Sequence, residues 1–318
     1  EWGGPGKEAG NYFWGYWQNE INFALATGND TFLNESINYR YPGFQYWSDN
    51  VGKGGMPIES SAYGPAMLGY SVFPFDALLQ TKNGRYWNDW FNDAVRAVIN
   101  WTLPNGDLFR FGDDSDFAQA GANFYLGDFM TAMSWYGDDE TGRLARAWLQ
   151  KFSVRRTPWV GAVDKSVGIY SFDWLPLHFY APGPGFYFAR TSWLPNSTVI
   201  LLQLKNCEGG GHAHRDAGTF QMWSSGKWIT TEHTGYRSSI PYGDPIHHNC
   251  VLVDGRGHNY PQFWAAAPLA SPPVGNKSNV NLTYAYRSHD PRFDNPDIRE
   301  LTRDFEFYSD VRLKVIDR

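Results

Sequence analysis

The sequence is poor in cysteine, in long apolar runs and in net positive charge, and each shortage excludes a class of protein. Two cysteines in 318 residues, Cys207 and Cys250, exclude a disulfide-rich scaffold. No apolar run is long enough to span a bilayer, and a net charge of −6 disfavours nucleic acids and anionic membranes as partners. We therefore expect a soluble globular protein that binds neither nucleic acid nor membrane.

Aromatic residues, in contrast, are abundant, and they make up 18% of the chain. A large core explains most of them, but aromatic faces also stack on sugar rings, so a carbohydrate cleft fits the excess of tryptophan equally well. The acidic net charge leaves an acidic polymer possible as substrate, since Arg, Lys and His can gather locally in a cleft.

Several features indicate a secreted protein. Six Asn-X-Ser/Thr sequons occur, where about two are expected by chance; they begin at Asn29, Asn34, Asn100, Asn196, Asn276 and Asn281. The chain starts at Glu1 without an initiator Met or an apolar signal segment, as a mature or trimmed product would. It ends on the strand-like "LKVIDR", so we expect further sequence beyond this end, and also before the N-terminus.

The chain divides into a helical half and a β-rich half. Apolar residues recur at helical spacing in segments 12–26, 63–80, 89–101, 122–135 and 140–152. Residues 153–180 are rich in Pro and Gly, and short runs rich in Val, Thr and aromatics follow, such as 186–193, 198–205, 218–232, 249–255, 280–287 and 303–317. We predict an α/α domain over 1–165 and an antiparallel β-domain over 166–318.

Histidines are concentrated in one part of the β-rich half. Five of the eight lie within 37 residues, namely His212, His214, His233, His247 and His248. The H-x-H spacing of His212 and His214 places both imidazoles on one face of a strand. Glu232, at the end of the next predicted strand, and His248, opening another, can reach the same rim. Imidazoles with one carboxylate suit Zn²⁺, with Mn²⁺ as the alternative.

Cys207 and Cys250 flank this histidine cluster on its two sides. Two interpretations stay open, a disulfide that braces the site and a pair of ordinary buried thiols. A role as metal ligands is the least expected.

Four ordered motifs resemble the central segment of the heparinase II/III-like polysaccharide lyases. They are an aromatic-x-x-Arg-x-x-Trp strand with Arg190 and Trp193, the H-x-H-x-D-x-x-x-F run from His212 to Phe220, Glu232 before the Gly-Tyr turn of Tyr236, and the His-Asn-x-Val-x-Val-Asp run from His248 to Asp254. The resemblance implies an incomplete (α/α) toroid followed by an antiparallel β-sandwich, in agreement with the organisation above.

The helical half carries a further motif that is similar to the family's. "GGMPIESSAYGPAMLGY" resembles its Gly-Gly-rich loop followed by Glu and Tyr, here Glu59 and Tyr63. The family's Asn-His pair is only half present, because "AGNYFWGYW" offers Asn11 and Trp14 without a histidine. The residue that neutralises a substrate carboxylate from this half is therefore open. Glu232 also stands where several members have Asp, a change that still permits metal binding.

The resemblance implies β-elimination in an anionic, uronic-acid polysaccharide. His212 would neutralise the substrate carboxylate or act as base, and Tyr63 and Tyr236 would be acid and base, with Tyr70 and Tyr242 as substitutes. His214, Glu232 and His248 would bind a structural metal. Asp216 would orient a neighbouring histidine, and the substrate contacts would come from Asn11, Glu59, Arg190 and Arg215, with Arg237 as a further candidate.

Three other functions compete with this one. A uronate C5-epimerase, similar to the dermatan sulfate epimerases, would remove the same proton and return it to the opposite face. A glycoside hydrolase could use a carboxylate pair drawn from Asp113, Asp114, Asp116 and Glu59, but would leave the histidine cluster unexplained. A non-catalytic glycan-binding protein could use the metal only to hold a sheet together.

Overall fold

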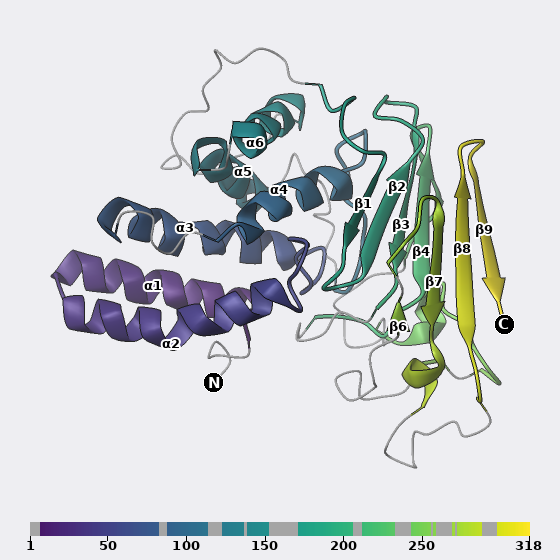
Figure 1. Cartoon of the computed structure of the whole chain (residues 1–318), viewed down its shortest axis with the longest axis horizontal. Coiled ribbons are helices and arrows are strands. Elements are labelled where there is room, and N and C mark those ends of the chain that lie inside the picture. Colours follow the sequence, from purple (N-terminus) through teal and green to yellow (C-terminus); the bar gives the residue numbers. More distant parts are fainter. Residues whose placement is uncertain are drawn as a thin grey trace.

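The chain folds into helices on one side and two antiparallel sheets on the other (Figure 1). The computed structural model describes residues 7–82, 88–113, 123–136, 139–152, 171–205, 212–232, 243–255, 257–258, 269–270, 272–287 and 298–318. Within these ranges every α-helix precedes residue 153 and every strand follows residue 177, which confirms the α+β class. The domain boundary predicted between residues 165 and 166 lies outside the described residues. No helix in the described ranges is long and apolar enough to cross a membrane.

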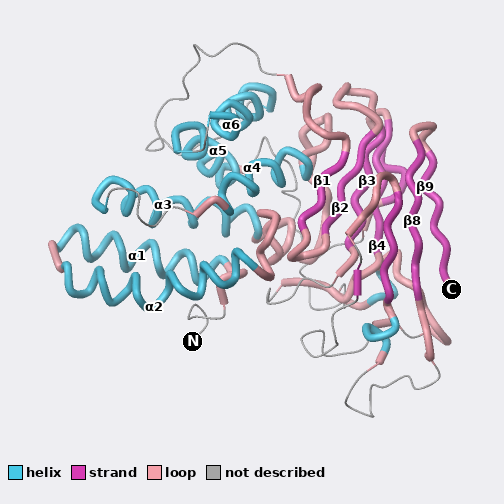
Figure 2. The backbone as a smooth tube through the Cα atoms, viewed as in Figure 1, coloured by secondary structure: helices cyan, strands magenta, loops and turns pink. Residues whose placement is uncertain are grey.

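The helices form part of an α/α array (Figure 2). Those described are α1 (Asn11–Thr27), α2 (Asp30–Asp49), α3 (Gly64–Lys82), α4 (Trp90–Trp101), α5 (Phe124–Tyr136) and α6 (Asp139–Phe152). Helix α1 packs against α2 and α3, and α5 packs between α3 and α6. All the predicted helices are present, with ends that shift by a few residues.

Helix α2 is the element that the sequence analysis missed. Its interior contains Pro42, which removes a backbone donor and usually ends or kinks a helix. Its start is marked by Asn29, whose side-chain oxygen accepts a hydrogen bond from the N–H of Phe32 at 3.0 Å. Ile37 and Phe44, two turns apart, then bury the same face of the helix. Capping and burial therefore outweigh the proline.

The strands form two antiparallel sheets. The first has the order β1 (His178–Ala181), β2 (Phe186–Arg190), β3 (Thr198–Gln203), β4 (Thr219–Ser224) and β5 (Lys227–Thr230). The second has the order β6 (Leu269–Ala270), β7 (Lys277–Asn281), β8 (Thr302–Tyr308) and β9 (Arg312–Asp317). Each sheet is a meander in which neighbours in sequence are neighbours in space.

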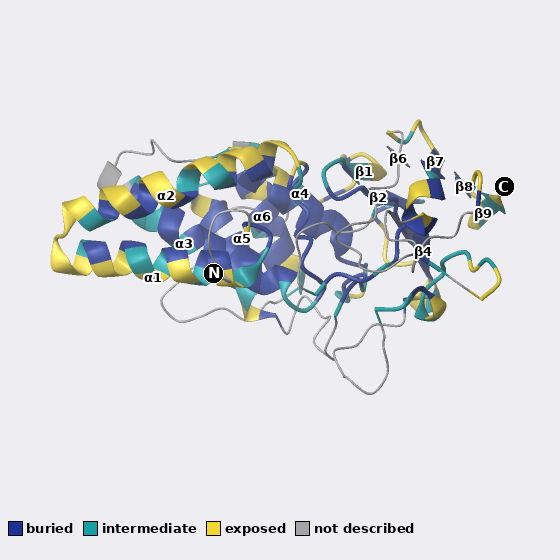
Figure 3. Ribbon diagram, turned by 90° about the horizontal axis from the view of Figure 1, so that it is seen from below, coloured by how far each residue is buried: buried dark blue, intermediate teal, exposed yellow. Residues whose placement is uncertain are grey.

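The first sheet is buried on both faces, so the molecule has three layers (Figure 3). Along β2, Phe186 and Phe188 join the core shared with the helices, whereas Tyr187 joins the core shared with the second sheet. On the second sheet, Val280 and Phe305 complete that second core. Because successive side chains point to opposite faces, a strand in this position is expected to be apolar along most of its length, as β2 and β3 are apart from polar residues at their ends. The two facing sheets agree with the expected sandwich.

Three strand assignments made from the sequence need correction. Strand β1 lies in the segment read as a linker. The strand predicted over 280–287 ends at Asn281, whose side chain accepts a hydrogen bond from the N–H of Thr283 and starts a 3₁₀-helix. The segment 249–255 is not a strand: only Val253 forms a β-bridge, and side chains make other contacts, as where the hydroxyl of Tyr286 donates to the carbonyl of Val251.

The N-terminus of α1 is capped from a distant part of the chain. Gly10 precedes the helix and has no side chain to cap it, and Glu59 takes this role, since its Oε2 accepts the N–H of Asn11 at 2.8 Å. Glu59 is only 3% exposed. Burial raises the pKa of Glu59 from an ordinary 4.5 to about 7, against the opposing effects of the Asn11 hydrogen bond and of nearby His212.

The raised pKa of Glu59 predicts a pH-dependent stability. The neutral carboxyl is favoured in the folded state, so its stabilising effect is fully present below pH 4.5 and is lost as the pH rises through 7. Between pH 5 and pH 8, the free energy of unfolding of the wild type should fall by up to about 3 kcal/mol more than that of Glu59→Gln. Urea unfolding at the two pH values measures this difference. The exposed Glu35→Gln on α2 is the control, and a loss equally large in both variants would contradict the assignment.

Gly55 is a second position where the fold makes a strict demand. Its φ is +77°, and a Cβ there would lie 2.2 Å from the backbone nitrogen of Ala94 in α4. Gly55→Ala should therefore lower the free energy of unfolding by about 3 kcal/mol. Gly15→Ala on α1 has nothing within 4 Å of the new Cβ and should leave stability unchanged or raise it by up to about 1 kcal/mol. Equal melting temperatures for the two variants would refute the prediction.

Candidate active site

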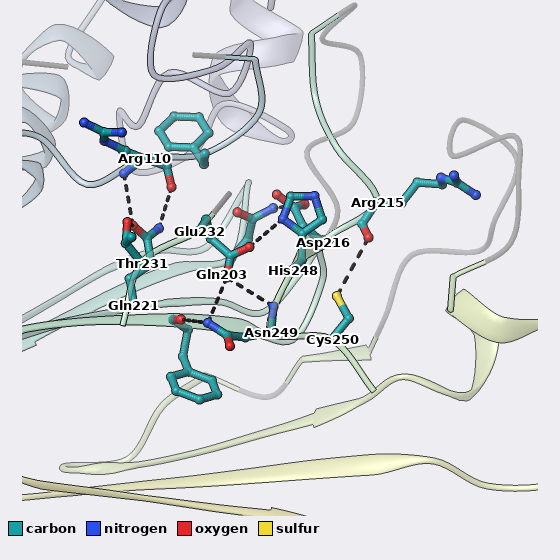
Figure 4. A network of polar contacts seen from close by, with 12 residues as sticks. Arg110, Gln203, Arg215, Asp216, Gln221, Thr231, Glu232, His248, Asn249 and Cys250 are labelled. Carbon is teal, nitrogen blue, oxygen red and sulfur yellow. Dashed lines mark hydrogen bonds and ion pairs between the residues drawn. The ribbon is translucent and has the colours of Figure 1, made fainter. Parts of the chain in front are cut away.

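The candidate site lies where the loop after α4 meets the first sheet. Gln221 on β4 holds this loop with both ends of its amide: its Oε1 accepts the N–H of Arg110 at 3.2 Å, and its Nε2 donates to the carbonyl of the same residue (Figure 4). The carbonyl of Phe111 accepts the N–H of Ser61 at 2.8 Å. The loop is thus fixed on both sides before it reaches Asp113.

Asp113 joins the two histidines of the H-x-H motif. Its Oδ2 lies 2.7 Å from Nδ1 of His212, and its Oδ1 lies 2.9 Å from Nε2 of His214. Burial alone would raise the pKa of Asp113, but the hydrogen bonds with both imidazoles outweigh burial and lower it. We expected both histidines to lie on a strand, but this prediction was wrong, because they lie in irregular chain before β4. A shared carboxylate, rather than a shared strand face, brings their rings together.

Tyr63 contacts the same cluster from the helical side. The side-chain oxygen of Ser60 accepts the N–H of Tyr63 at 3.0 Å just before α3 begins. The phenol ring then stacks on the imidazole of His212, with centroids 3.7 Å apart and planes inclined by 5°. Two residues predicted to be catalytic, one from each half of the chain, are therefore in direct contact. The side chain of His212 is 18% exposed, so the pair is not sealed from solvent.

Within the described residues, no other tyrosine predicted to transfer a proton is seen in contact with His212. Tyr70 shares a hydrogen bond with Tyr125, with the two hydroxyl oxygens 2.9 Å apart. Tyr236, which was predicted to be catalytic, lies outside the described residues, as do Tyr242 and Arg237. Its role stays a prediction.

Glu232 and His248 form a buried pair beside His214. Nδ1 of His248 lies 2.5 Å from Oε2 of Glu232, and both side chains are almost fully buried. Asn249 donates from its side chain to the other carboxylate oxygen at 3.2 Å (Figure 4). The rings of His214 and His248 are 5.2 Å apart. The three residues predicted to bind metal are therefore neighbours, although His248 follows a short 3₁₀-helix instead of opening a strand.

The fit of this group to a metal ion is partial. Two imidazoles and a carboxylate are donors that suit zinc, and Nδ1 of His214 is buried without a hydrogen-bond partner among the described residues. Within those residues, however, no group of three or more His, Cys, Asp or Glu is arranged to hold a metal ion. In this arrangement Glu232 bonds to His248 and His214 bonds to Asp113. The metal site therefore stays a prediction.

Asp216 lies close by, but it does not have the role that we expected. It accepts a hydrogen bond from the side chain of Gln203, whereas Asp113 is the carboxylate that bonds to His212 and His214. Burial raises the pKa of Asp216 to about 6, although nearby His248 and His214 act in the opposite direction. Sequence reasoning had considered Asp113 only as one acid of a hydrolase. Its position directly after a Gly in "RFGDD" carries no signal for a histidine partner.

The predicted substrate-binding residues are spread around the site. Arg190 is 4% exposed and lies over the Trp193 ring, and its Nη2 donates to the carbonyl of Asn100 in the last turn of α4 at 3.2 Å. Burial lowers the pKa of Arg190 to about 9. Arg190 therefore joins α4 to the first sheet, and its burial disfavours contact with a polymer.

Arg215, Asn11 and Glu59 complete that set. Arg215 forms an ion pair with Asp244 and donates to the carbonyl of His258 at 3.2 Å. Asn11 opens α1 beside Glu59, and Glu59 itself caps the helix. Substrate contact by these residues stays a prediction.

Cys250 is a free cysteine whose sulfur lies 3.8 Å from the carbonyl of Arg215 and 3.7 Å from that of Ala217. Burial raises the pKa of its thiol. Cys207, the partner in the disulfide that we considered, lies outside the described residues. Of the two interpretations, the structure gives Cys250 that of a buried thiol.

The chain is similar to known proteins in its fold, but its sequence matches none of the family models or curated proteins compared. Solved structures do match. The crystal structure of the heparan sulfate lyase HepC from Pedobacter heparinus aligns with a TM-score of 0.62 at 18% identity, over 95% of this chain and 44% of that one. The crystal structure of heparinase III aligns with a TM-score of 0.59 at 15% identity, over 98% of this chain and 47% of that one.

The chain thus spans less than half the length of these lyase structures. At this level of identity the likeness concerns the path of the backbone, which extends through both the helices and the sheets of this chain. The chain has the fold of the heparinase III-like polysaccharide lyases.

Proposed function

We propose that the chain is the catalytic part of a polysaccharide lyase that cleaves a uronic-acid-containing polymer by β-elimination. The observation that carries the proposal is the stack of Tyr63 on His212, 3.7 Å apart, where the helical half meets the first sheet. It brings a phenol and an imidazole together in a fold that solved polysaccharide lyases share.

The chemistry requires groups of these two kinds. The proton at C5 of a uronate is only weakly acidic while the adjacent carboxylate is charged, so the carboxylate must be neutralised as a base removes the proton. The C4–O bond then breaks, a C4–C5 double bond forms, and the glycosidic oxygen takes up a proton. His212 serves as the base or as the group that neutralises the carboxylate. Tyr63 and Tyr236 serve as proton donor and acceptor.

We further propose that His214, Glu232 and His248 would hold Zn²⁺, with Mn²⁺ as the alternative. Their donor atoms, their burial and the 5.2 Å between the two imidazole rings support this. Bound there, the ion would fix the geometry of the loops that carry the histidines. The burial of the three side chains favours this structural role over activation of a water molecule.

The competing functions differ in how well the geometry supports them. An epimerase would use the same proton abstraction and is separated from a lyase only by its product. A hydrolase is disfavoured, because both carboxylate oxygens of Asp113 already bond to imidazoles and Glu59 caps a helix. Asp114 and Asp116 lie outside the described residues. A glycan-binding protein would leave the chain length of every polymer unchanged.

Secretion and glycosylation are also proposed, on the strength of the sequons. One of the six is disfavoured: Asn100 lies buried in α4, and its side-chain amide donates to the carbonyl of Arg96 at 2.9 Å. The other sequons carry the proposal.

The catalytic proposal predicts ultraviolet-absorbing, unsaturated products from at least one polymer in a panel of alginate, glucuronan, hyaluronan and sulfated glycosaminoglycans. Tyr63→Phe should reduce turnover by about a hundredfold or more, because it removes only the oxygen that moves the proton. His212→Ala should have a similar effect, and the two losses should not multiply in the double variant if both groups act in one step.

The exposed Tyr46→Phe on α2 is the matched control and should keep wild-type turnover. Near-normal activity of Tyr63→Phe would transfer the role to Tyr70, and near-normal activity of His212→Ala would overturn the mechanism. Epimerised product without unsaturation would instead support the epimerase.

The metal proposal predicts about one equivalent of Zn, or of Mn, in protein purified without added metal. His214→Ala should lose the ion and lower the melting temperature, because ligand removal takes binding free energy from the folded state. His212→Ala and the exposed His178→Ala should both keep it. Stoichiometric metal in a His214/His248 double variant, measured by elemental analysis, would rule the assignment out.

A further inference from the structure

We infer that Asp113 is a positioning residue that sets the tautomers of His212 and His214 together. Through it, proton transfer at His212 and ligation at His214 depend on one carboxylate from the helical half. The expected effect on activity rests on the proposed function. The effect on the tautomers does not.

The backbone leaves the Asp113 carboxylate little freedom of position. Its own N–H donates to the carbonyl of His212 at 2.8 Å. The preceding Gly112 has a φ of +60°, and a Cβ there would lie 2.6 Å from that same carbonyl oxygen and 2.8 Å from Cβ of Ser60. The loop, the His212 backbone and the segment leading to Tyr63 are therefore packed directly against one another. Close packing of this kind holds the carboxylate in place.

The hydrogen bonds then determine which imidazole nitrogens carry hydrogen. A carboxylate offers only accepting oxygens, so Nδ1 of His212 and Nε2 of His214, which lie 2.7 and 2.9 Å from them, must donate. In neutral imidazoles the opposite nitrogens, Nε2 of His212 and Nδ1 of His214, then carry the lone pairs. One carboxylate thus selects opposite tautomers in the two histidines.

These are the nitrogens that a base at His212 and a metal ligand at His214 require, so of the two roles proposed for His212 the geometry favours that of the base. Nδ1 of His214 is buried and makes no hydrogen bond within the described residues, as expected for an atom reserved for a ligand. The ring of His212 is held by Asp113 on one edge and covered by Tyr63 on one face. Rotating this ring would break both contacts. In the neutral ring, Nε2 of His212 is therefore the nitrogen that carries the lone pair.

Replacing Asp113 with asparagine distinguishes an effect on the histidine tautomers from an effect on packing. Asparagine has the same shape but only one accepting oxygen, and its NH₂ group can only donate. In Asp113→Asn one imidazole can keep its tautomer, while the other must present a lone pair to the amide. Glutamate keeps two accepting oxygens on a longer side chain and should restore part of the original arrangement.

The test is ¹⁵N NMR of histidine-labelled protein near neutral pH, which distinguishes the two neutral tautomers without any substrate. Wild type should show the Nδ1–H form for His212 and the Nε2–H form for His214. In Asp113→Asn one of the two should change. Asp107→Asn is the control, because this half-buried residue lies on the same loop and its side chain bonds only to Asn105 among the contacts described. It should change neither tautomer.

Turnover by the same variants supplies the second measurement. Asp113→Asn should lower kcat by about tenfold to a hundredfold with little change in KM, and Asp113→Glu should recover part of the loss. Unchanged tautomers in Asp113→Asn would overturn the inference, whether or not the protein is a lyase. A tautomer change in a protein that cleaves no uronic-acid polymer would support the inference and refute the proposed function.

Discussion

The structure depends on the burial of the first sheet on both of its faces. Strands β2 and β3 alternate between two cores, one shared with the helices and one shared with the second sheet. This double burial fixes the register, because a slip by one residue would exchange the sets of side chains facing the two layers. It also places β4, and with it Gln221, against the loop after α4. The site is shared between the two halves because this sheet packs directly on the helices.

The sequence was informative wherever one physical signal dominated. Helical periodicity located all of the described helices except α2, where Pro42 concealed a segment held by the Asn29 cap and by buried Ile37 and Phe44. Runs rich in Val, Thr and aromatics identified β2 and β3 directly, and the run 303–317 contains two strands, β8 and β9. Segment 249–255 was wrongly predicted as a strand because it keeps a single β-bridge, at Val253, and makes further contacts through side-chain hydrogen bonds, which no periodicity records.

For the site, the sequence identified the residue types but not all of their partners. His212, His214, Glu232 and His248 could be found from their clustering, and Tyr63 from a resemblance in the helical half. Asp113 could not, because its contacts with the two histidines span about a hundred residues of sequence and arise only when the loop after α4 docks on the first sheet. Arg190 was assigned to substrate for a comparable reason: an arginine in a motif gives no sign of its burial against α4.

The amide of Gln221 holds the loop through the backbone of Arg110 and not through its side chain. Such an attachment is indifferent to the identity of the residue it holds, provided that the residue has an N–H, so every amino acid except proline meets the requirement. These two hydrogen bonds therefore survive any change of side chain at position 110, three residues before Asp113. Evolution can alter that side chain and keep this attachment of the loop that carries the histidines' shared carboxylate.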